Sequence, residues 1–328
     1  MAHVAVAHPN IALAKYWGKR DRGRNVPAVP SLSVTLGGMT TTTRAEVADV
    51  DSLVVNQRPQ SGRPVERASA MLDRLWREAG RDGPRPHAAI VSTNDFPTAA
   101  GLASSASAFA ALAVAGDALL GTALGRERLS CLARQISASA GRSLFGGFVE
   151  LPAGDAGAEH LPARPVAGVD HWDLRLVVAV TTEGEKDVGS TEGMNRTTET
   201  SPLYEAWVHS APSIFARVKE AVLARDFDAL TAPVEQSALV MHATALGADP
   251  GLVYWNGTTV EVIRAVRKLR AAGLPACFTI DAGPHVKVLV PAAYERAVTE
   301  EIGRVPGVLR TIAARPGEGA RLITVAEE

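Results

Sequence analysis

The chain has 328 residues, of which 46% are hydrophobic and 21% are charged, and its formal net charge is −1. This length exceeds what one small core needs and suits two domains, and the composition excludes wholesale disorder. The nearly neutral charge excludes a broad basic field of the kind that collects nucleic acid or anionic lipid.

The two cysteines, Cys131 and Cys277, each lie in an apolar stretch and are far apart in the sequence. They predict buried thiols in a reducing compartment rather than a disulfide framework or a zinc site. The N-terminal residues lack the basic and apolar regions of a signal peptide, and no run approaches the roughly 18 apolar residues of a membrane span. We therefore expect a cytoplasmic protein that binds neither nucleic acid nor membrane.

The first half of the chain alternates between strand and helix patterns. Strands are predicted where apolar and polar side chains alternate or where short apolar runs occur, at 31–36, 40–47, 88–91, 144–151 and 174–181. The Gly37-Gly38 turn indicates a hairpin between the first two of these strands. Helices are predicted where apolar residues recur at helical spacing, at 67–79, 104–120 and about 127–140.

The second half begins with a polar, aperiodic stretch at 182–201, which predicts a loop, and we place a domain boundary near residue 185. Helices are expected at 203–224, at 227–245 with a break near Pro233, and at 258–273, where Thr258 and Glu261 have capping-box spacing. The remainder predicts strands and one helix, at 276–281, 286–290, 292–303, 307–314 and 321–325. This pattern is typical of α+β folds with an antiparallel sheet.

The segment from Phe96 to Ala110 has the composition of a phosphate-binding loop. It supplies Pro, Gly and small side chains between a strand and a helix, so backbone N–H groups and the helix N-terminus can approach an anion. The hydroxyls of Ser104 and Ser105 could reach phosphate oxygens or Mg²⁺. The segment is neither a Walker A loop nor a Rossmann fingerprint. An ordinary strand-to-helix turn with a Ser N-cap fits it equally well.

Two further segments place cations among hydrogen-bonding side chains. Lys15, Tyr16 and Lys19 crowd together near the N-terminus, which suits recognition of a polyanion, although a strand with solvent-facing charges is favoured on this segment alone. Arg142 follows the serines at 137 and 139, with no acidic residue nearby in the sequence. It could bind a carboxylate or phosphate through two hydrogen bonds, or it could cap the carbonyl groups of a helix.

Two polar turns occur in the second half. The stretch 189–197 lies at the expected domain junction, where substrates often bind, although a plain linker is favoured without other support. Asp281 ends an apolar strand before an Ala-Gly-Pro turn and suits a general base or a partner of Lys or Arg. The alternative is an Asp that caps its own turn. No histidine has metal-ligand spacing.

Taken together and in this order, these motifs resemble the GHMP kinase superfamily, and within it the mevalonate diphosphate decarboxylase family. The motifs, which span most of the chain, read Asn-Ile-Ala-Leu-Ala-Lys-Tyr-Trp-Gly-Lys-Arg-Asp, Asn-Asp-Phe-Pro-Thr-Ala-Ala-Gly-Leu-Ala-Ser-Ser-Ala, Arg-Ser-Leu-Phe-Gly-Gly, Ser-Thr-Glu-Gly-Met, Met-His-Ala and Asp-Ala-Gly-Pro. The resemblance implies an α+β GHMP kinase fold. A ribosomal protein S5 domain 2-like, ATP-binding domain would occupy 1–185, a ferredoxin-like α+β domain would occupy 186–328, and the active-site cleft would lie between them.

The resemblance also implies an enzyme, a carboxy-lyase that uses ATP and Mg²⁺. The family phosphorylates the 3-hydroxyl of (R)-mevalonate 5-diphosphate and then loses phosphate and CO₂ to give isopentenyl diphosphate. Asp281 matches the family residue that takes or orients the hydroxyl proton, Lys15 matches the Lys beside it, and Arg142 matches the Arg that grips the C1 carboxylate. A homodimer is also expected from the family.

Other positions are assigned by the same resemblance. Those that match substrate-binding positions are Ala14, Tyr16, Lys19, Ser137, Ser139, Arg142, Ser190 and Met194. Those that match the ATP-binding loop are Pro97, Ala99, Ala100, Gly101, Leu102, Ala103, Ser104 and Ser105, with Ser105 reaching Mg²⁺ through the ATP phosphates.

Three positions depart from the family pattern. Ala138 stands where the family usually has Gly, Gly141 where it has Cys, and Gly189 where Ser is common. These departures leave open the number of phosphates on the substrate. The alternatives are a decarboxylase of mevalonate 5-phosphate or 3,5-bisphosphate, another GHMP small-molecule kinase, and a non-catalytic RNA-binding relative. Near-neutral charge and the presence of Asp281 argue against the last.

Overall fold

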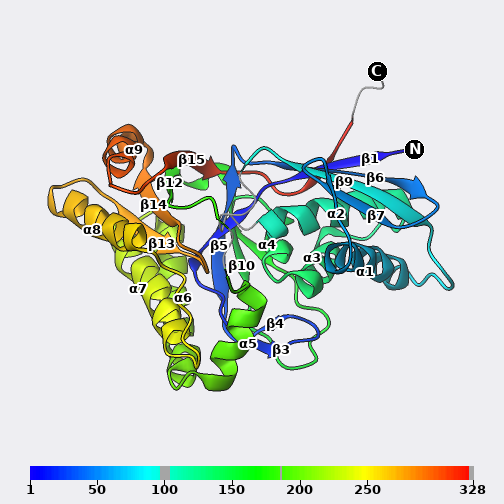
Figure 1. The fold of residues 1–328 in the computed structure, drawn as a ribbon, viewed down its shortest axis with the longest axis horizontal. Helices are drawn as coiled ribbons and strands as arrows, with labels where there is room; N and C mark the ends of the chain where they lie inside the picture. Colours follow the sequence, from blue (N-terminus) through cyan, green and yellow to red (C-terminus); the bar gives the residue numbers. More distant parts are fainter. Residues whose placement is uncertain (97–103, 185–186, 325–328) are drawn as a thin grey trace.

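The computed structural model describes residues 1–96, 104–184 and 187–324 and shows two lobes side by side (Figure 1). The first lobe contains a six-stranded sheet, which is mostly antiparallel. Its strands, in spatial order, are β16 (Arg321–Ile323), β1 (His3–Ala7), β6 (Thr41–Ala48), β9 (His87–Asn94), β7 (Ser52–Val55) and β8 (Arg58–Pro59).

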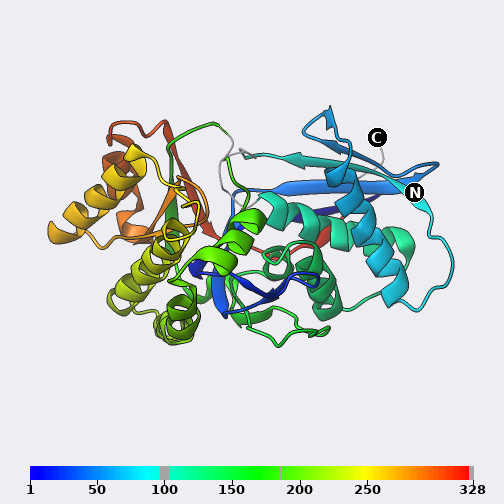
Figure 2. The ribbon, with the colours of Figure 1, turned by 60° about the horizontal axis from the view of Figure 1, so that its bottom comes forward.

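Helices cover one face of this first sheet, as Figure 2 shows. They are α1 (Arg63–Glu78), α2 (Ser104–Leu120), α3 (Arg126–Ile136) and the short α4 (Ala140–Ser143). Alanines dominate the contact between α2 and the strands, where Ala110, Ala111 and Ala113 are fully buried. Such small side chains allow a helix to approach the sheet closely, and they leave α2 without a one-sided apolar stripe.

The second sheet has eight strands and runs through both lobes. In spatial order they are β11 (Arg164–Ala167), β10 (Phe148–Leu151), β5 (Ser31–Gly37), β15 (Arg310–Pro316), β12 (Leu174–Val180), β14 (Val286–Pro291) and β13 (Cys277–Ile280), with β2 (Asn10–Ala14) also paired with β5. A two-stranded ribbon of β3 (Lys19–Asp21) and β4 (Val26–Pro27) lies apart from both sheets.

Helices cover both faces of the second-lobe part of this sheet. One face packs on α6 (Tyr204–Ala224) and α7 (Phe227–Leu246), and the other on α8 (Gly257–Ala271) and α9 (Glu295–Gly303). Val178 and Leu289 belong to the core on the side of α6 and α7, whereas Val177 and Val288 belong to the core on the side of α8 and α9. Successive side chains on a strand point to opposite faces, which explains the division. The short 3₁₀ helices are η1 (Val169–His171) and η2 (Ala292–Tyr294).

The polar stretch expected as a loop at 182–201 is instead helical from Ser190 to Thr200, and this helix is α5. The sequence prediction was wrong because the buried face of α5 consists of Gly193, Met194 and Thr197. Small and polar side chains give no hydrophobic period. Thr197 satisfies its hydroxyl inside the helix by donating to the Gly193 carbonyl oxygen at 2.7 Å.

The hairpin predicted at the Gly37-Gly38 turn was wrong, because the strands on its two sides, β5 and β6, belong to different sheets. Some element boundaries also differ from the sequence predictions. Helix α7 continues through Pro233 without a break, and it packs against α6 and β13, with Leu230 and Val234 buried on either side of the proline. The capping box of α8 uses Asn256 and Thr259 rather than Thr258 and Glu261, so the helix starts at Gly257. The helix expected to reach residue 140 ends at Ile136, and one further helical turn, α4, follows a short gap.

The end of the chain returns to the first lobe. Strand β15 pairs with β5 through Arg315 and Pro316, and β16 pairs with β1 through Val4, Ala5 and Val6. The lobes are therefore joined by backbone pairing as well as by the chain between them. The domain division near residue 185 stays a prediction, and Glu185 itself lies outside the described residues.

Candidate active site

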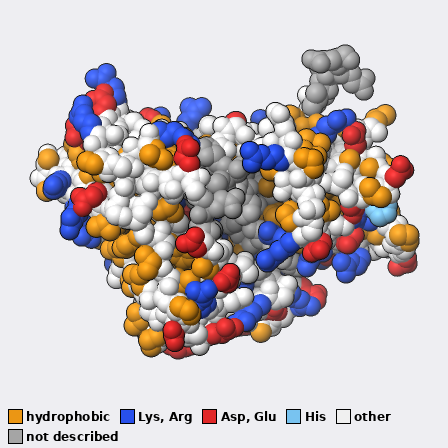
Figure 3. Space-filling view, in the orientation of Figure 1, with side chains coloured by type: hydrophobic (Ala, Val, Ile, Leu, Met, Phe, Trp, Pro, Cys, Tyr) orange, Lys and Arg blue, Asp and Glu red, His pale blue; other side chains and the backbone are white. Residues whose placement is uncertain are grey.

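A cavity of about 970 Å³ lies where the two lobes meet. It is lined by residues of β2, α1, α2 and α4 from the first lobe and by the starts of α5 and the 281–284 turn from the second. On the face shown in Figure 3, basic and acidic side chains are interspersed over both lobes. The local chemistry of the cavity thus depends on individual buried charges rather than on a charged surface.

Lys15 and Asp281 form a buried ion pair at one side of the cavity. The Lys15 Nζ donates to Asp281 Oδ1 at 2.5 Å and to the Ala12 carbonyl oxygen at 2.9 Å. The Lys15 side chain is 1% exposed, whereas that of Asp281 is 25% exposed and faces the cavity. The expectation of solvent-facing charges on the N-terminal segment is therefore wrong for Lys15.

The surroundings shift the pKa of both members of this pair. Burial lowers the pKa of Lys15 to about 8, although Asp281 acts to raise it. Burial would raise the pKa of Asp281, but the positive charges of Lys15, Lys287 and Arg142 outweigh it and hold the pKa below its ordinary value. Asp281 is therefore a carboxylate at neutral pH, with one edge accessible from the cavity.

Two polar side chains hold the Arg142 guanidinium in place. Its Nε donates to Asn10 Oδ1 at 3.2 Å and its Nη1 to Ser31 Oγ at 2.9 Å, and only 3% of the residue is exposed. Burial lowers its pKa to about 10. It does not cap a helix through a hydrogen bond in the described residues. A buried, positioned guanidinium that lines the cavity suits a carboxylate or phosphate.

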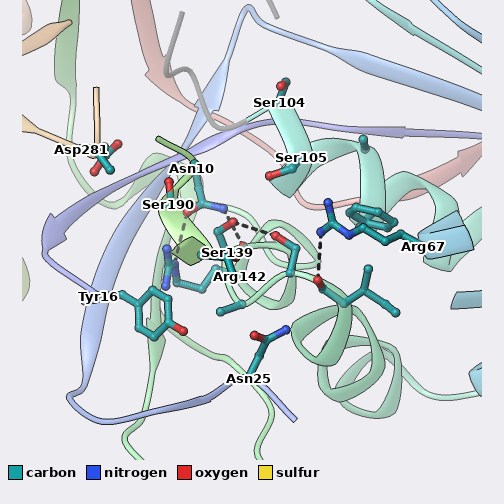
Figure 4. A pocket seen from close by; sticks show the side chains of 18 of the residues that line it. Asn10, Tyr16, Asn25, Arg67, Ser104, Ser105, Ser139, Arg142, Ser190 and Asp281 are labelled. Atoms are coloured by element: carbon teal, nitrogen blue, oxygen red, sulfur yellow. Dashed lines mark hydrogen bonds between the residues drawn. The ribbon is translucent and has the colours of Figure 1, made fainter. Parts of the chain in front are cut away.

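The hydroxyls near Arg142 lie on the same wall of the cavity. Ser137 and Ser139 both line it, with their Oγ atoms 3.4 Å apart. Figure 4 shows Ser139, Arg142 and Ser190 in the middle of the site, between Asp281 on one side and Ser105 and Arg67 on the other. Ser190 begins α5, so the helix N-terminus also points its N–H groups toward this region.

Aromatic and basic residues of the N-terminal segment continue the wall. The hydroxyl of Tyr16 is buried with no hydrogen-bond partner in the described part of the chain, and burial raises its pKa. Burial, together with Arg67, Arg22 and Arg63, lowers the pKa of Lys19 to about 8. Such crowding of like charges is typical of a site that binds an anion.

Of the remaining predicted positions, Met194, Ser104 and Ser105 also line the cavity. Ala14 does not, because its side chain lies in the core beside β5, although its backbone is adjacent to Lys15. The predicted ATP-loop positions Pro97, Ala99, Ala100, Gly101, Leu102 and Ala103 lie outside the described residues.

Several lining residues were not predicted. Asn10 orients Arg142, Arg67 stacks over Phe109 at 4.6 Å, and Trp17, Asn25 and Glu192 also face the cavity. Asn10 and Trp17 stand inside a recognised motif and could have been singled out there. Arg67 belongs to a helix whose amphipathic pattern indicated only a solvent-facing charge, so nothing in the sequence pointed to it.

No cluster of three or more His, Cys, Asp or Glu side chains that could hold a metal occurs in the described ranges. Among those same residues, no helix combines the length and the apolar character that a membrane span requires. Cys131 and Cys277 are both free and buried, as their apolar settings predicted.

Two family models match the chain. The diphosphomevalonate decarboxylase-like N-terminal domain matches residues 7–161, and the mevalonate 5-diphosphate decarboxylase C-terminal domain matches residues 176–312. The diphosphomevalonate decarboxylase of Candida albicans is 35% identical over 317 residues, which cover 91% of this chain and 88% of the relative.

Solved structures show the same likeness. Mevalonate diphosphate decarboxylase from Staphylococcus aureus has a TM-score of 0.91 and 36% identity, covering 98% of each chain. The structure described as MDDEF in complex with MVAPP, AMPPCP and magnesium has a TM-score of 0.90 and 36% identity, covering 99% of each chain. The expected two-domain α+β GHMP kinase fold is thereby confirmed.

Proposed function

Since the chain belongs to the diphosphomevalonate decarboxylase family, we propose that it converts (R)-mevalonate 5-diphosphate and ATP to isopentenyl diphosphate, ADP, phosphate and CO₂. The observation that supports this reaction best is the arrangement in one cavity of the Lys15–Asp281 pair and the buried Arg142. A base, a cation beside it and a carboxylate-binding guanidinium are the groups that the two chemical steps require.

We assign the proton of the 3-hydroxyl to Asp281. A tertiary alcohol is a weak nucleophile, so holding its oxygen beside the ATP γ-phosphate supplies much of the rate. Asp281 is ionised at neutral pH and reaches the cavity, so it can accept the hydroxyl proton as the O–P bond forms. Lys15 balances the charge of Asp281 and stabilises negative charge on the transferring phosphoryl oxygens.

Arg142 is assigned to the C1 carboxylate. Loss of CO₂ requires the C1–C2 bond to align with the bond from C3 to the departing phosphate, so that the electron pair forms the new double bond. A planar guanidinium locked by Asn10 and Ser31 can fix the carboxylate in that orientation. The departing phosphate accepts the electrons of the broken C–O bond, so no separate electron sink is needed.

Tyr16, Lys19, Ser137 and Ser139 are assigned to the diphosphate and carboxylate ends of the substrate. The hydroxyl of Tyr16 is buried and unpartnered in the described residues, a state that costs free energy unless a ligand supplies the hydrogen bond. Lys19 lies among other cations, and an anionic ligand relieves their repulsion. Ser190 and Met194 contribute from α5, and the Ala14 backbone is adjacent to Lys15.

ATP and Mg²⁺ fit the first-lobe side of the cavity. Ser104 and Ser105 stand at the N-terminus of α2, where backbone N–H groups favour phosphate, and we assign the ATP phosphates to them and to residues 97–103. The described residues offer no protein cage of carboxylates for a metal, which suits Mg²⁺ held largely by phosphate oxygens and water. We assign the Ser105 hydroxyl to the Mg²⁺ ion. The ion would neutralise negative charge on the ATP phosphates.

The departures from the family pattern have different structural settings. A side chain at Gly141 would meet the Ser130 carbonyl oxygen at 3.0 Å, so packing against α3 favours glycine there. Gly189 has open space around it, and Ala138 lines the cavity. Only Ala138 and Gly189 can therefore alter the shape of the substrate site directly.

The experiment that tests the function uses purified protein with Mg·ATP and mevalonate 5-diphosphate labelled at C1, with ADP and CO₂ followed together. Equal amounts of ADP and CO₂ are expected. ADP without CO₂ would identify a 3-kinase, and turnover only with mevalonate 5-phosphate or the 3,5-bisphosphate would correct the substrate. A salt-dependent RNA gel shift without ATP turnover would instead favour the non-catalytic alternative.

The compartment and the assembly belong to the same proposal. We place the protein in the cytoplasm as a homodimer, which binds its two small substrates and neither nucleic acid nor membrane. The two free, buried thiols agree with a reducing compartment. Light scattering coupled to size-exclusion chromatography tests the dimer, since a particle of twice the 34.4 kDa chain mass is expected.

A further inference from the structure

Strand β14 contains one charged residue in an otherwise apolar sequence. Lys287 stands between Val286 and Val288, and its side chain is 0% exposed. Placing an ammonium group in an apolar strand is strongly unfavourable unless an opposite charge or hydrogen bonds compensate it. The position of Lys287 therefore calls for a partner on the side of the sheet that its side chain faces.

The alternation of the strand decides which side that is. Val286 and Val288 belong to the core beneath α8 and α9, so Lys287 faces the opposite side. There it pairs in register with Thr279, whose hydroxyl donates to the Ala12 carbonyl oxygen at 3.0 Å. The same carbonyl oxygen accepts from the Lys15 Nζ. Lys287 thus lies beneath the Lys15–Asp281 pair.

The two ammonium groups approach the two oxygens of one carboxylate. The Nζ of Lys15 is 2.5 Å from Asp281 Oδ1, and the Nζ of Lys287 is 3.9 Å from Asp281 Oδ2. Lys287 also donates to the His285 carbonyl oxygen at 3.3 Å. The side chain therefore ties Asp281, at one end of the 281–285 turn, to the backbone at the other end.

We propose that Lys287 is a positioning residue that fixes the orientation and the negative charge of Asp281 from beneath, on the side away from substrate. The proposal rests on the role proposed above for Asp281. Lys15 alone would leave the carboxylate free to rotate about its bond and to take a proton on Oδ2. With Lys287 in place, the accessible edge of Asp281 keeps a constant orientation toward the cavity.

The other titratable groups around Asp281 do not replace this function. Arg142 also contributes positive charge to the carboxylate, but its guanidinium is held by hydrogen bonds to Asn10 and Ser31. His242 of α7 bonds to the backbone of Ile280 and Asp281, and burial lowers its pKa to about 3. His285 accepts from the Thr181 N–H, and burial lowers its pKa to about 4. Both histidines are neutral near pH 7.

The test compares Lys287→Met with the wild type in kcat/KM between pH 5 and pH 9.5. Removing a cation about 4 Å from a carboxylate raises the pKa of that carboxylate by about one unit or more. The wild-type to variant ratio of kcat/KM should therefore rise by up to about twofold as the pH falls from 8 to 5, because the carboxylate of the variant begins to take up a proton near pH 5. Ionisation of the substrate diphosphate affects both proteins equally and cancels in the ratio.

Lys15 supplies a second signal in the same profile. Lys287 acts to lower the pKa of Lys15, so its removal should move the loss of activity at alkaline pH toward higher pH. A matched control is Val288→Ala, the next residue of the strand on the opposite face. It should lose stability without changing the shape of the profile. A constant ratio for Lys287→Met at all pH values would overturn the proposal.

Thermal unfolding gives a readout that does not require activity. Asp281→Asn leaves two buried ammonium groups without their counter-ion, so its melting temperature should fall, and adding Lys287→Met should restore part of the loss. Additive losses would contradict the proposal. Lys287→Met alone could yield no folded protein. In that case a folded Asp281→Asn/Lys287→Met double variant still supports the proposal. A double variant that does not fold, beside an Asp281→Asn variant that does, overturns the proposal. Wild-type turnover, measured in parallel, tests the proposed function separately.

Discussion

Individual residues of the site owe their properties to burial more than to their own chemistry. Three charged groups of the cavity are buried, and burial and neighbouring charges move the pKa of each from its ordinary value. They are Lys15, Arg142 and Asp281. The carboxylate stays ionised because three cations outweigh the cost of burial. The positive charge of such a site attracts polyanionic substrates.

Replacing Asp281 tests the assignment of the proton acceptor. For Asp281→Asn we expect kcat to fall by about 10³-fold or more, since general-base catalysis acts mainly in the transition state. The dissociation constant of Mg·ATP, measured by calorimetry, should change little. Glu192→Gln is a matched control, because it removes a second carboxylate from the same cavity. A normal kcat in Asp281→Asn would exclude the role.

Replacing Arg142 separates the two steps of the reaction. Arg142→Lys keeps the charge and loses the planar fork, so the C1 carboxylate loses its fixed orientation. We expect CO₂ release to fall by about tenfold or more, because one charge-assisted hydrogen bond to the carboxylate is lost. ADP release should fall less. The ratio of CO₂ to ADP measures this directly. A ratio that stays at one would remove Arg142 from the alignment step.

The pH dependence follows from Lys15. Its pKa in the folded protein is about 8, below the ordinary 10.5, so the ammonium loses its proton as the pH rises through about 8. We expect kcat/KM, which reports the free enzyme, to decline there. Lys19 has a similar pKa, so the measurement is repeated with Lys19→Arg. A decline that persists in this variant belongs to Lys15, and one that disappears belongs to Lys19.

At the scale of elements, α5 is positioned by a close approach of its backbone to two aromatic rings. A side chain at Gly193 would run into the hydroxyl of Tyr254 and would meet the Trp17 ring at 3.2 Å. Tyr254 cannot swing away, because its ring packs edge-on against Trp17 at 6.0 Å and His242 at 6.1 Å between centroids. Gly193 thus sets the depth at which Ser190 and Met194 enter the cavity.

Gly193→Ala should therefore destabilise the protein although alanine favours helix. The clash costs about 1–3 kcal/mol, against about 1 kcal/mol gained from helix propensity. We expect a lower melting temperature and a raised KM for the diphosphate substrate. Gly257→Ala, in the first turn of α8 with open space around it, is the control and should lose nothing. Equal melting temperatures for the two variants would contradict this account of α5.

Across the whole molecule, the site depends on how the lobes are joined. Asp281 and Ser190 come from the second half of the chain, whereas Lys15 and Arg142 come from the first. Backbone pairing between β5 and β15 holds these halves in register, and Thr279 and Ser237 bond to the backbone of Ala12 and Lys15. A rigid junction of this kind keeps the ion pair closed without a ligand.

Gly317→Ala tests the junction. A side chain there would collide with the backbone of Gly37, which cannot move without separating β15 from β5. We expect a loss of several kcal/mol, in the range of severe overpacking, and a melting temperature lower by several degrees. Gly168→Ala, where nothing lies within 4 Å, is the matched control. If calorimetry gave both variants the melting temperature of the wild type, the role of the junction would be refuted.

The sequence by itself determined the class of fold, the family and the positions of the motifs. Alternating and helical periodicities located most strands and helices, because they report which face each element buries. Asp281, Lys15 and Arg142 could be named because they stand in motifs. By contrast, α5 was missed because small and polar residues form its buried face, and the run of α7 through Pro233 depended on packing with other elements.

The tertiary structure alone decided the electrostatics of the site. The ion pair joins residues 266 positions apart, and the strand pattern that contains Lys287 gave no sign that its ammonium lies under Asp281. The contacts of Asn10 with Arg142 and of Tyr254 with Gly193 are likewise long-range. Periodicity reports the environment of one element at a time, whereas a pKa depends on charges that several elements bring to one place.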